Sequence, residues 1–154
     1  MEVYKSYPLL SADEIQKIES KLEVTLPSDY VEFLKNVNAA SIKAYYFKGI
    51  ECGNYFGGFL AQQMDLSHSM VNLNYGLARA GNEEEFVTGK DYIWFASDHA
   101  GSLILMSMLE KSHGKIYYLR QDLTYSEGLR LITHSFTDFI NLLTEYENHV
   151  EERN

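Results

Sequence analysis

The fold is decided by one stretch of the chain, residues 91–109, which read DYIWFASDHAGSLILMSML. Two short apolar runs, 92–96 and 103–109, lie on either side of a polar turn that contains Gly101. Apolar runs joined by such a turn are typical of a β-hairpin. Because neither run alternates cleanly between apolar and polar residues, we expect strands that are covered on much of both faces. Trp94, in the middle of the first run, is expected to belong to the core.

The sheet should extend beyond this hairpin. Residues 112–115 (SHGK) predict a tight turn, and residues 116–119 (IYYL) predict a third strand. The order strand, turn, strand, turn, strand predicts an antiparallel meander. Residues 129–132 favour a further edge strand. Upstream, the aromatic runs 44–47 and 55–59 are punctuated by glycines and indicate one or two strands with a turn or bulge.

Helical patterns precede the sheet. Ser11 and Glu14 form a Ser-x-x-Glu capping box, and apolar residues follow at helical spacing as far as Leu22. Pro27 suits the end of this helix or the start of the next, since proline is tolerated in a first turn and disruptive inside. A second amphipathic stripe runs from there to about Asn38.

A last helix is predicted from Ser135, the capping residue, with a buried stripe made of Phe136, Phe139, Ile140, Leu143 and Tyr146. Residues 67–80 indicate a short, irregular helix, and residues 81–90 an exposed acidic loop. These patterns predict an α+β fold with a mostly antiparallel sheet, on which an N-terminal helix pair and a C-terminal helix pack. We expect residues 1–154 to form a single domain.

Composition restricts the possible functions. The 154 residues are 45% hydrophobic and 14% aromatic, which is enough to bury the core of one domain. The formal net charge is -9. A surface of that sign argues against a nucleic-acid partner, because phosphate contacts need Lys and Arg. It favours a basic partner or serves only solubility, and the sequence leaves both open.

The expected location is the cytosol. Cys52 is the only cysteine, so no intrachain disulfide forms and a reducing compartment fits best. The first residues lack the charged-then-apolar build of a secretory signal. The longest strongly apolar stretch, 100–109, is too short to span a bilayer, so no membrane partner is expected.

The sequence carries no recognisable catalytic or metal-binding pattern, and we expect neither an enzyme nor a cofactor. The histidines lack the i, i+4 pairing and the cysteine partners that identify metal sites; they are His68, His99, His113, His134 and His149. Ser97, Asp98 and His99 are consecutive, whereas a catalytic triad is assembled through space, so we interpret them as a turn.

Three segments resemble the SUKH superfamily, which includes the fungal Smi/Knr-type cell-wall regulators and many bacterial immunity proteins. Residues 26–34 (LPSDYVEFL) are similar to its Leu-Pro-x-Asp-Tyr-x-x-Phe-Leu signature, and residues 93–101 (IWFASDHAG) to its apolar strand and Ala-x-Asp-x-x-Gly turn. Residues 114–118 (GKIYY) and 135–140 (SFTDFI) resemble its Gly-x-Val-Tyr strand and Ser-Phe-x-x-Phe-Leu helix.

The resemblance implies an α+β fold and a non-catalytic binding protein, in bacteria typically one that neutralises a co-encoded toxin, often a nuclease. The alternative is a regulatory scaffold or adaptor that binds signalling partners, as in the fungal relatives. The chain departs from the family pattern at 38–40 (NAA), where Asn-Gly is common, and at Gly101-Ser102, where Gly-Asp is usual. The second departure removes an acidic side chain.

A basic toxin domain is the expected partner, and acidic residues near the hairpin are the expected contacts. The segment 81–99 holds one base, Lys90, and five acids: Glu83, Glu84, Glu85, Asp91 and Asp98. A second acidic segment, 136–154, lies largely in a tail. Groups on a rigid element lose less entropy on binding, so we place the partner-facing residues in the first segment. The alternative is that both segments only maintain solubility.

Overall fold

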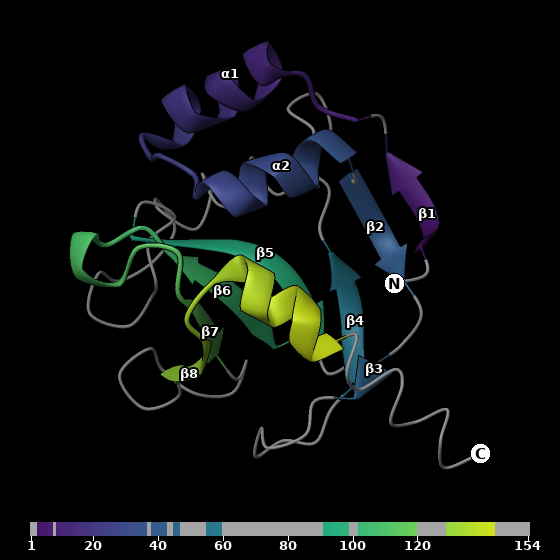
Figure 1. Cartoon of the computed structure of the whole chain (residues 1–154). Helices are drawn as coiled ribbons and strands as arrows, with labels where there is room; N and C mark the ends of the chain where they lie inside the picture. Colours follow the sequence, from purple (N-terminus) through teal and green to yellow (C-terminus); the bar gives the residue numbers. More distant parts are fainter. Residues whose placement is uncertain are drawn as a thin grey trace.

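A computed structural model describes residues 3–7, 9–36, 38–42, 45–46, 55–59, 91–98, 102–119 and 129–143. The helices are α1 (Ala12–Leu22), α2 (Ser28–Asn36), the short 3-10 helix η1 (Glu110–Ser112) and a C-terminal helix, 136–143. The strands are β1 (Val3–Tyr7), β2 (Asn38–Ile42), β3 (Tyr45–Tyr46), β4 (Tyr55–Phe59), β5 (Tyr92–Asp98), β6 (Leu103–Ser107), β7 (Ile116–Leu119) and β8 (Leu129–Thr133) (Figure 1).

The main sheet has six antiparallel strands in the order β3-β4-β5-β6-β7-β8. The predicted hairpin is β5 and β6, which pair from Tyr92↔Ser107 to Ser97↔Leu103. The meander and the edge strand are therefore confirmed. The turn after β5 begins later than predicted, since Ser97 and Asp98 still belong to the strand.

An irregularity in β5 shapes the core. Trp94 pairs with Leu105 and Ala96 with Ile104, so Phe95 is an extra residue in its strand. Such a bulge breaks the strict alternation of faces. Phe95 and Ala96 are adjacent in sequence, yet both are fully buried in the same hydrophobic cluster.

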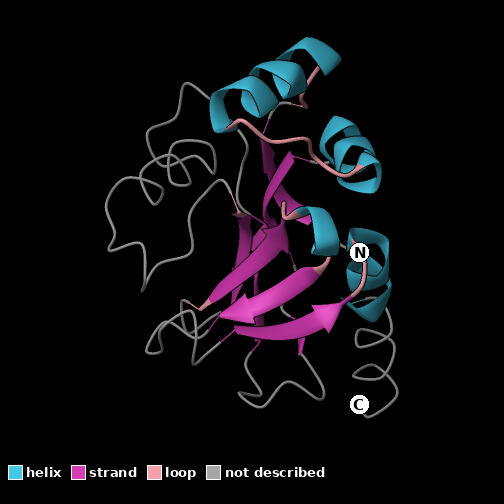
Figure 2. Cartoon of the chain, turned by 90° about the vertical axis from the view of Figure 1, so that its left-hand side faces the viewer, coloured by secondary structure: helices cyan, strands magenta, loops and turns pink. Residues whose placement is uncertain are grey.

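The helices pack on one face of the sheet. Figure 2 shows them gathered on one side of the strands, and Figure 1 shows the C-terminal helix crossing in front of β5, β6 and β7. The core between the two layers draws on every helix except η1, with Ile18, Leu34 and Phe139 each at most 1% exposed. The other face of the sheet carries a second buried cluster, Tyr92, Leu105 and Leu119. Both faces of β5 and β6 are thus covered, as their apolar runs predicted.

The N-terminal helices begin where the sequence signals lie. Ser11 Oγ accepts from the Glu14 backbone N–H and the Glu14 carboxylate accepts from the Ser11 N–H, both at 3.2 Å. Pro27 precedes α2, and its carbonyl accepts the first helical hydrogen bond, from Val31 N–H at 3.0 Å. The second helix ends at Asn36 rather than Asn38, which is a correction.

Two further differences concern the sheets. The chain enters β2 at Asn38 and pairs with β1, from Tyr7↔Asn38 to Val3↔Ile42, in a separate two-stranded sheet that the sequence pattern did not predict. Trp94 is only partly buried and packs at the margin of both clusters, where its indole N–H donates to the Ala96 carbonyl at 2.8 Å. The predicted helix at 67–80 and the acidic loop at 81–90 lie outside the described residues.

Candidate functional site

The segments that resemble SUKH proteins meet in an aromatic cluster inside the core. Tyr30 and Phe33 come from α2, Phe95 from β5, and Phe136 and Phe139 from the C-terminal helix. The ring centroids of Phe136 lie 5.0 Å from Tyr30 and 4.9 Å from Phe33, and both contacts are edge-to-face. This geometry is favourable for aromatic pairs beyond the area that they bury. The apolar and aromatic signature residues therefore hold the helices on the sheet.

The signature aspartate has a matching structural role. Asp29 Oδ2 accepts two hydrogen bonds from Thr137, one from its backbone N–H and one from its hydroxyl, each 3.1 Å long. Ser135 Oγ accepts from the Asp138 N–H at 3.0 Å and caps the same helix, as predicted. A carboxylate near a helix N-terminus also interacts favourably with the helix dipole. Asp29 thus fastens the C-terminal helix to α2.

The signature glycine lies in a turn that only glycine fits well. Lys115 N–H donates to the Ser112 carbonyl at 3.0 Å, and His113 has φ -53 and ψ 124. Gly114 has φ +85, so this is a type II turn, which favours glycine at its third position. A Cβ at Gly114 would lie 3.4 Å from Pro27 Cγ, which shows how closely the turn approaches the start of α2.

His113 connects this turn to the linker between α1 and α2. Its Nε2 lies 2.6 Å from the Thr25 carbonyl oxygen, across 88 positions of sequence. No sequence pattern connects these two residues, and His113 alone is typical of an isolated surface histidine. Together with the contact between Pro27 and Gly114, the bond holds the α1–α2 linker against the connection between β6 and β7.

An open groove of about 850 Å³ runs beside this contact, and we call it the α1–η1 groove. Its walls are the last turns of α1 with the linker residues Val24 and Thr25, Asp91 just before β5, and residues between Met108 and His113 around η1. Asp91 and Met108 are themselves joined, because the Met108 N–H donates to the Asp91 carbonyl at 2.7 Å.

The lining of the groove combines carboxylates with apolar side chains. Its described lining includes four carboxylates, Glu19, Glu23, Asp91 and Glu110, and no Lys or Arg. Glu19 also has a structural role, since its Oε2 accepts from the Leu26 backbone N–H at 2.8 Å. The apolar lining is Val24 and Met108, which pack against the core, and Leu109, which is 38% exposed.

The structure places two of the five acids singled out from the sequence. Asp91 is exposed and lines the groove, whereas Asp98 ends β5. A strand of seven residues separates them by roughly 20 Å. Glu83, Glu84 and Glu85 lie outside the described residues. Sequence reasoning missed Glu23 and Glu110, because nothing local signals that η1 lies beside the end of α1.

The groove is suited to binding cations and apolar groups. Among the described residues, no three His, Cys, Asp or Glu side chains converge so as to hold a metal ion. The four carboxylates come from α1 (Glu19), its C-terminal end (Glu23), the position before β5 (Asp91) and η1 (Glu110). Across the same part of the chain, no helix has the length and apolar character needed to cross a membrane.

Comparison with known proteins identifies the fold family. The model of the SMI1/KNR4 family (SUKH-1) matches residues 9–142, from just before α1 to the end of the C-terminal helix. No curated protein matches the sequence. The family match includes α2 with its aspartate, the central hairpin, the glycine turn and the capped final helix. This chain therefore belongs to the SMI1/KNR4 family (SUKH-1).

Proposed function

We propose that this chain is a non-catalytic protein-binding domain that neutralises a cognate bacterial toxin by covering its active site or substrate surface. The observation that carries the proposal is the SUKH-1 family match over residues 9–142. In this proposal residues 1–154 form one SUKH-like domain, which acts in the cytosol without a cofactor. The toxin is a protein with a basic binding surface, and a nuclease fits that description best.

The charge of the chain supports a basic partner. The net charge is -9, and the described lining of the α1–η1 groove contains four carboxylates and no Lys or Arg. A nuclease cleft is basic because it binds phosphates, and an acidic protein associates with it quickly and in a salt-dependent way. Nucleic acid itself fits the negative surface poorly.

The test is co-expression with the toxin domain encoded beside this gene in its native host. Cells that make the toxin alone should stop growing, and cells that also make this chain should grow normally. The purified chain should form a stable complex with the toxin domain in gel filtration. A neighbouring gene without toxic activity, together with capture of a signalling protein, would instead favour the scaffold or adaptor function.

Within this proposal the partner-facing acids are Glu83, Glu84, Glu85, Asp91 and Asp98. Glu83→Lys with Glu85→Lys should slow association with the toxin domain and flatten its salt dependence, because fewer charge pairs then steer the encounter. The same reversal at Glu151 and Glu152 serves as the control and should change little. A larger effect of the tail reversal, or no effect of either reversal, would rule out the interface at 81–99.

A further inference from the structure

We propose that the α1–η1 groove binds a segment of the partner in which basic side chains flank one apolar side chain. This inference rests on the proposed function and specifies its contact surface. The groove is formed by three parts of the chain that are distant in sequence: the end of α1, Asp91, and the connection around η1.

The apolar lining residues give the partner's apolar side chain a surface to pack on. Val24 and Met108 are partly buried against the core, and Leu109 is 38% exposed although it belongs to the longest apolar run of the sequence. Burying apolar surface that is exposed to water is favourable and contributes to affinity in proportion to the area buried. The exposed Leu109 side chain therefore favours a partner segment with an apolar side chain at this position.

The surrounding charge selects the flanking residues. Glu23, Asp91 and Glu110 are exposed and come from three different walls of the groove. Because these carboxylates belong to separate parts of the chain, they can pair with separate cations along a bound segment. Arginine is the best match, since its guanidinium forms paired hydrogen bonds with a carboxylate.

The walls are held in place before any partner binds. His113 Nε2 lies 2.6 Å from the Thr25 carbonyl oxygen, which joins the linker to the turn after η1. Behind η1, Ser107 is fully buried, and its Oγ lies 2.6 Å from Ser112 Oγ and accepts from the Leu109 N–H at 3.2 Å. A surface fixed in this way loses little entropy on association.

The first experiment measures binding of the full chain to the toxin domain by isothermal titration calorimetry and stopped-flow fluorescence. Glu23→Lys with Glu110→Lys should raise Kd about tenfold or more, mainly through slower association at low salt. Glu19 is left unchanged because its carboxylate bonds the Leu26 N–H.

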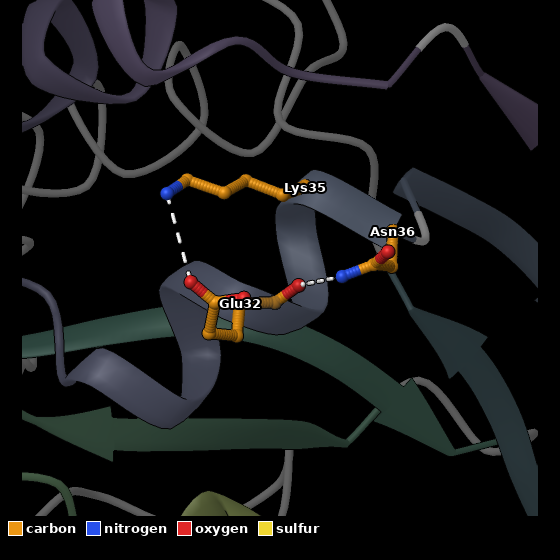
Figure 3. Close-up of polar contacts among 3 residues, drawn as sticks. All are labelled: Glu32, Lys35 and Asn36. Atoms are coloured by element: carbon orange, nitrogen blue, oxygen red, sulfur yellow. Dashed lines mark hydrogen bonds and ion pairs between the residues drawn. The ribbon is translucent and has the colours of Figure 1, made fainter.

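The matched control is Glu32→Lys, on the exposed side of α2. Glu32 is 69% exposed, forms a 3.6 Å ion pair with Lys35 and accepts from Asn36 through its backbone carbonyl, and it does not line the groove (Figure 3). Glu32→Lys should bind the toxin domain as the wild type does, and Glu110→Lys alone, with the same change in charge, should bind more weakly. Equal binding by both variants, or a larger loss from Glu32→Lys, would overturn the groove assignment.

A second variant separates binding from folding. Glu23 has φ 57, a left-handed conformation that is strained for a non-glycine residue and that glycine adopts freely. Glu23→Gly should therefore melt at or above the wild-type temperature and still bind the toxin domain several-fold more weakly. Binding at wild-type strength would show that the Glu23 carboxylate makes no contact.

A peptide probe tests the groove without the toxin. Acetyl-Gly-Arg-Leu-Lys-Gly-amide should bind the 15N-labelled chain at about millimolar Kd and shift the amide signals of Val24, Leu109 and Glu110. The same peptide with glutamate in place of its Arg and Lys should shift none of them. Shifts elsewhere, or none, would refute the groove proposal even if the chain protects cells. Groove shifts without protection would refute only the toxin assignment.

Discussion

Replacing Asp29 with alanine should lower the free energy of unfolding by about 2 kcal/mol. The carboxylate accepts from the Thr137 N–H and hydroxyl at 3.1 Å each, and from the Tyr30 N–H at 2.9 Å. Hydrogen bonds to charged groups contribute about 1.5–3 kcal/mol when buried, and the two bonds to Thr137 are exposed, so we count them as about 1–1.5 kcal/mol together. Negative charge near two helix N-termini adds about 0.5–1 kcal/mol.

The assay is urea unfolding at pH 7, followed by far-UV circular dichroism and by the fluorescence of Trp94. Asp29→Ala should also lower Tm by about 4–8 °C. Asp29→Asn keeps an oxygen acceptor but loses the charge, so it should lose roughly half as much stability. Asp13→Ala is the control, because Asp13 also lies in the first turn of a helix but is exposed. It should change stability by at most about 0.5 kcal/mol.

A double-mutant cycle of Asp29→Ala with Thr137→Val then isolates the side-chain part of this link. We expect a coupling energy of about 0.5–1 kcal/mol. Asp29→Ala that unfolds within about 0.5 kcal/mol of the wild type would refute the reasoning, because the C-terminal helix would then stay docked without this carboxylate.

Phe95→Ala should lower the free energy of unfolding by about 3–5 kcal/mol because the ring is fully buried, and Trp94→Ala should lower it clearly less because the indole is only partly buried. Urea unfolding of both variants measures this order. The reverse order would contradict the cluster boundaries. Gly114→Ala should cost about 1–2 kcal/mol through its positive φ, and an unchanged Tm would exclude the type II turn. Ser135→Ala should cost about 1 kcal/mol by loss of the helix cap, measured by the same method, and no loss would show that the cap contributes nothing.

Elements with local signals were predictable from the sequence. The capping box of Ser11 and Glu14 determines the start of α1 within four residues, and the turn at Gly114 depends on one dihedral angle. The meander followed because consecutive apolar runs with short turns pair with their neighbours in the chain. The strand β2 lacks such a signal: its Asn-Ala-Ala start has low strand propensity, and it forms by pairing with β1.

The groove forms through contacts between distant parts of the chain, so most of its residues could not be predicted from the sequence. Asp91 was found because it lies beside the hairpin, whereas Glu23 and Glu110 are scattered charges in the sequence. Only docking of the α1–α2 linker on the turn at His113 places them in one groove. The burial of Trp94 was overestimated for a related reason. A position in the middle of an apolar run does not determine how completely the side chain is buried.

The hydrogen bonds from Thr137 to Asp29 span 108 positions of sequence. The packing of the C-terminal helix can therefore form only after nearly all of the described chain has been synthesised. Closing a loop of that length costs roughly 4 kcal/mol of chain entropy, so this contact forms late in folding. During synthesis the segment 136–143 is the last described element to leave the ribosome. Until it does, Phe95 lacks the rings of Phe136 and Phe139, and the part of the apolar face that this helix covers stays exposed. A chain that ends shortly before Phe136 should therefore be less stable than the full chain and more easily cleaved by proteases.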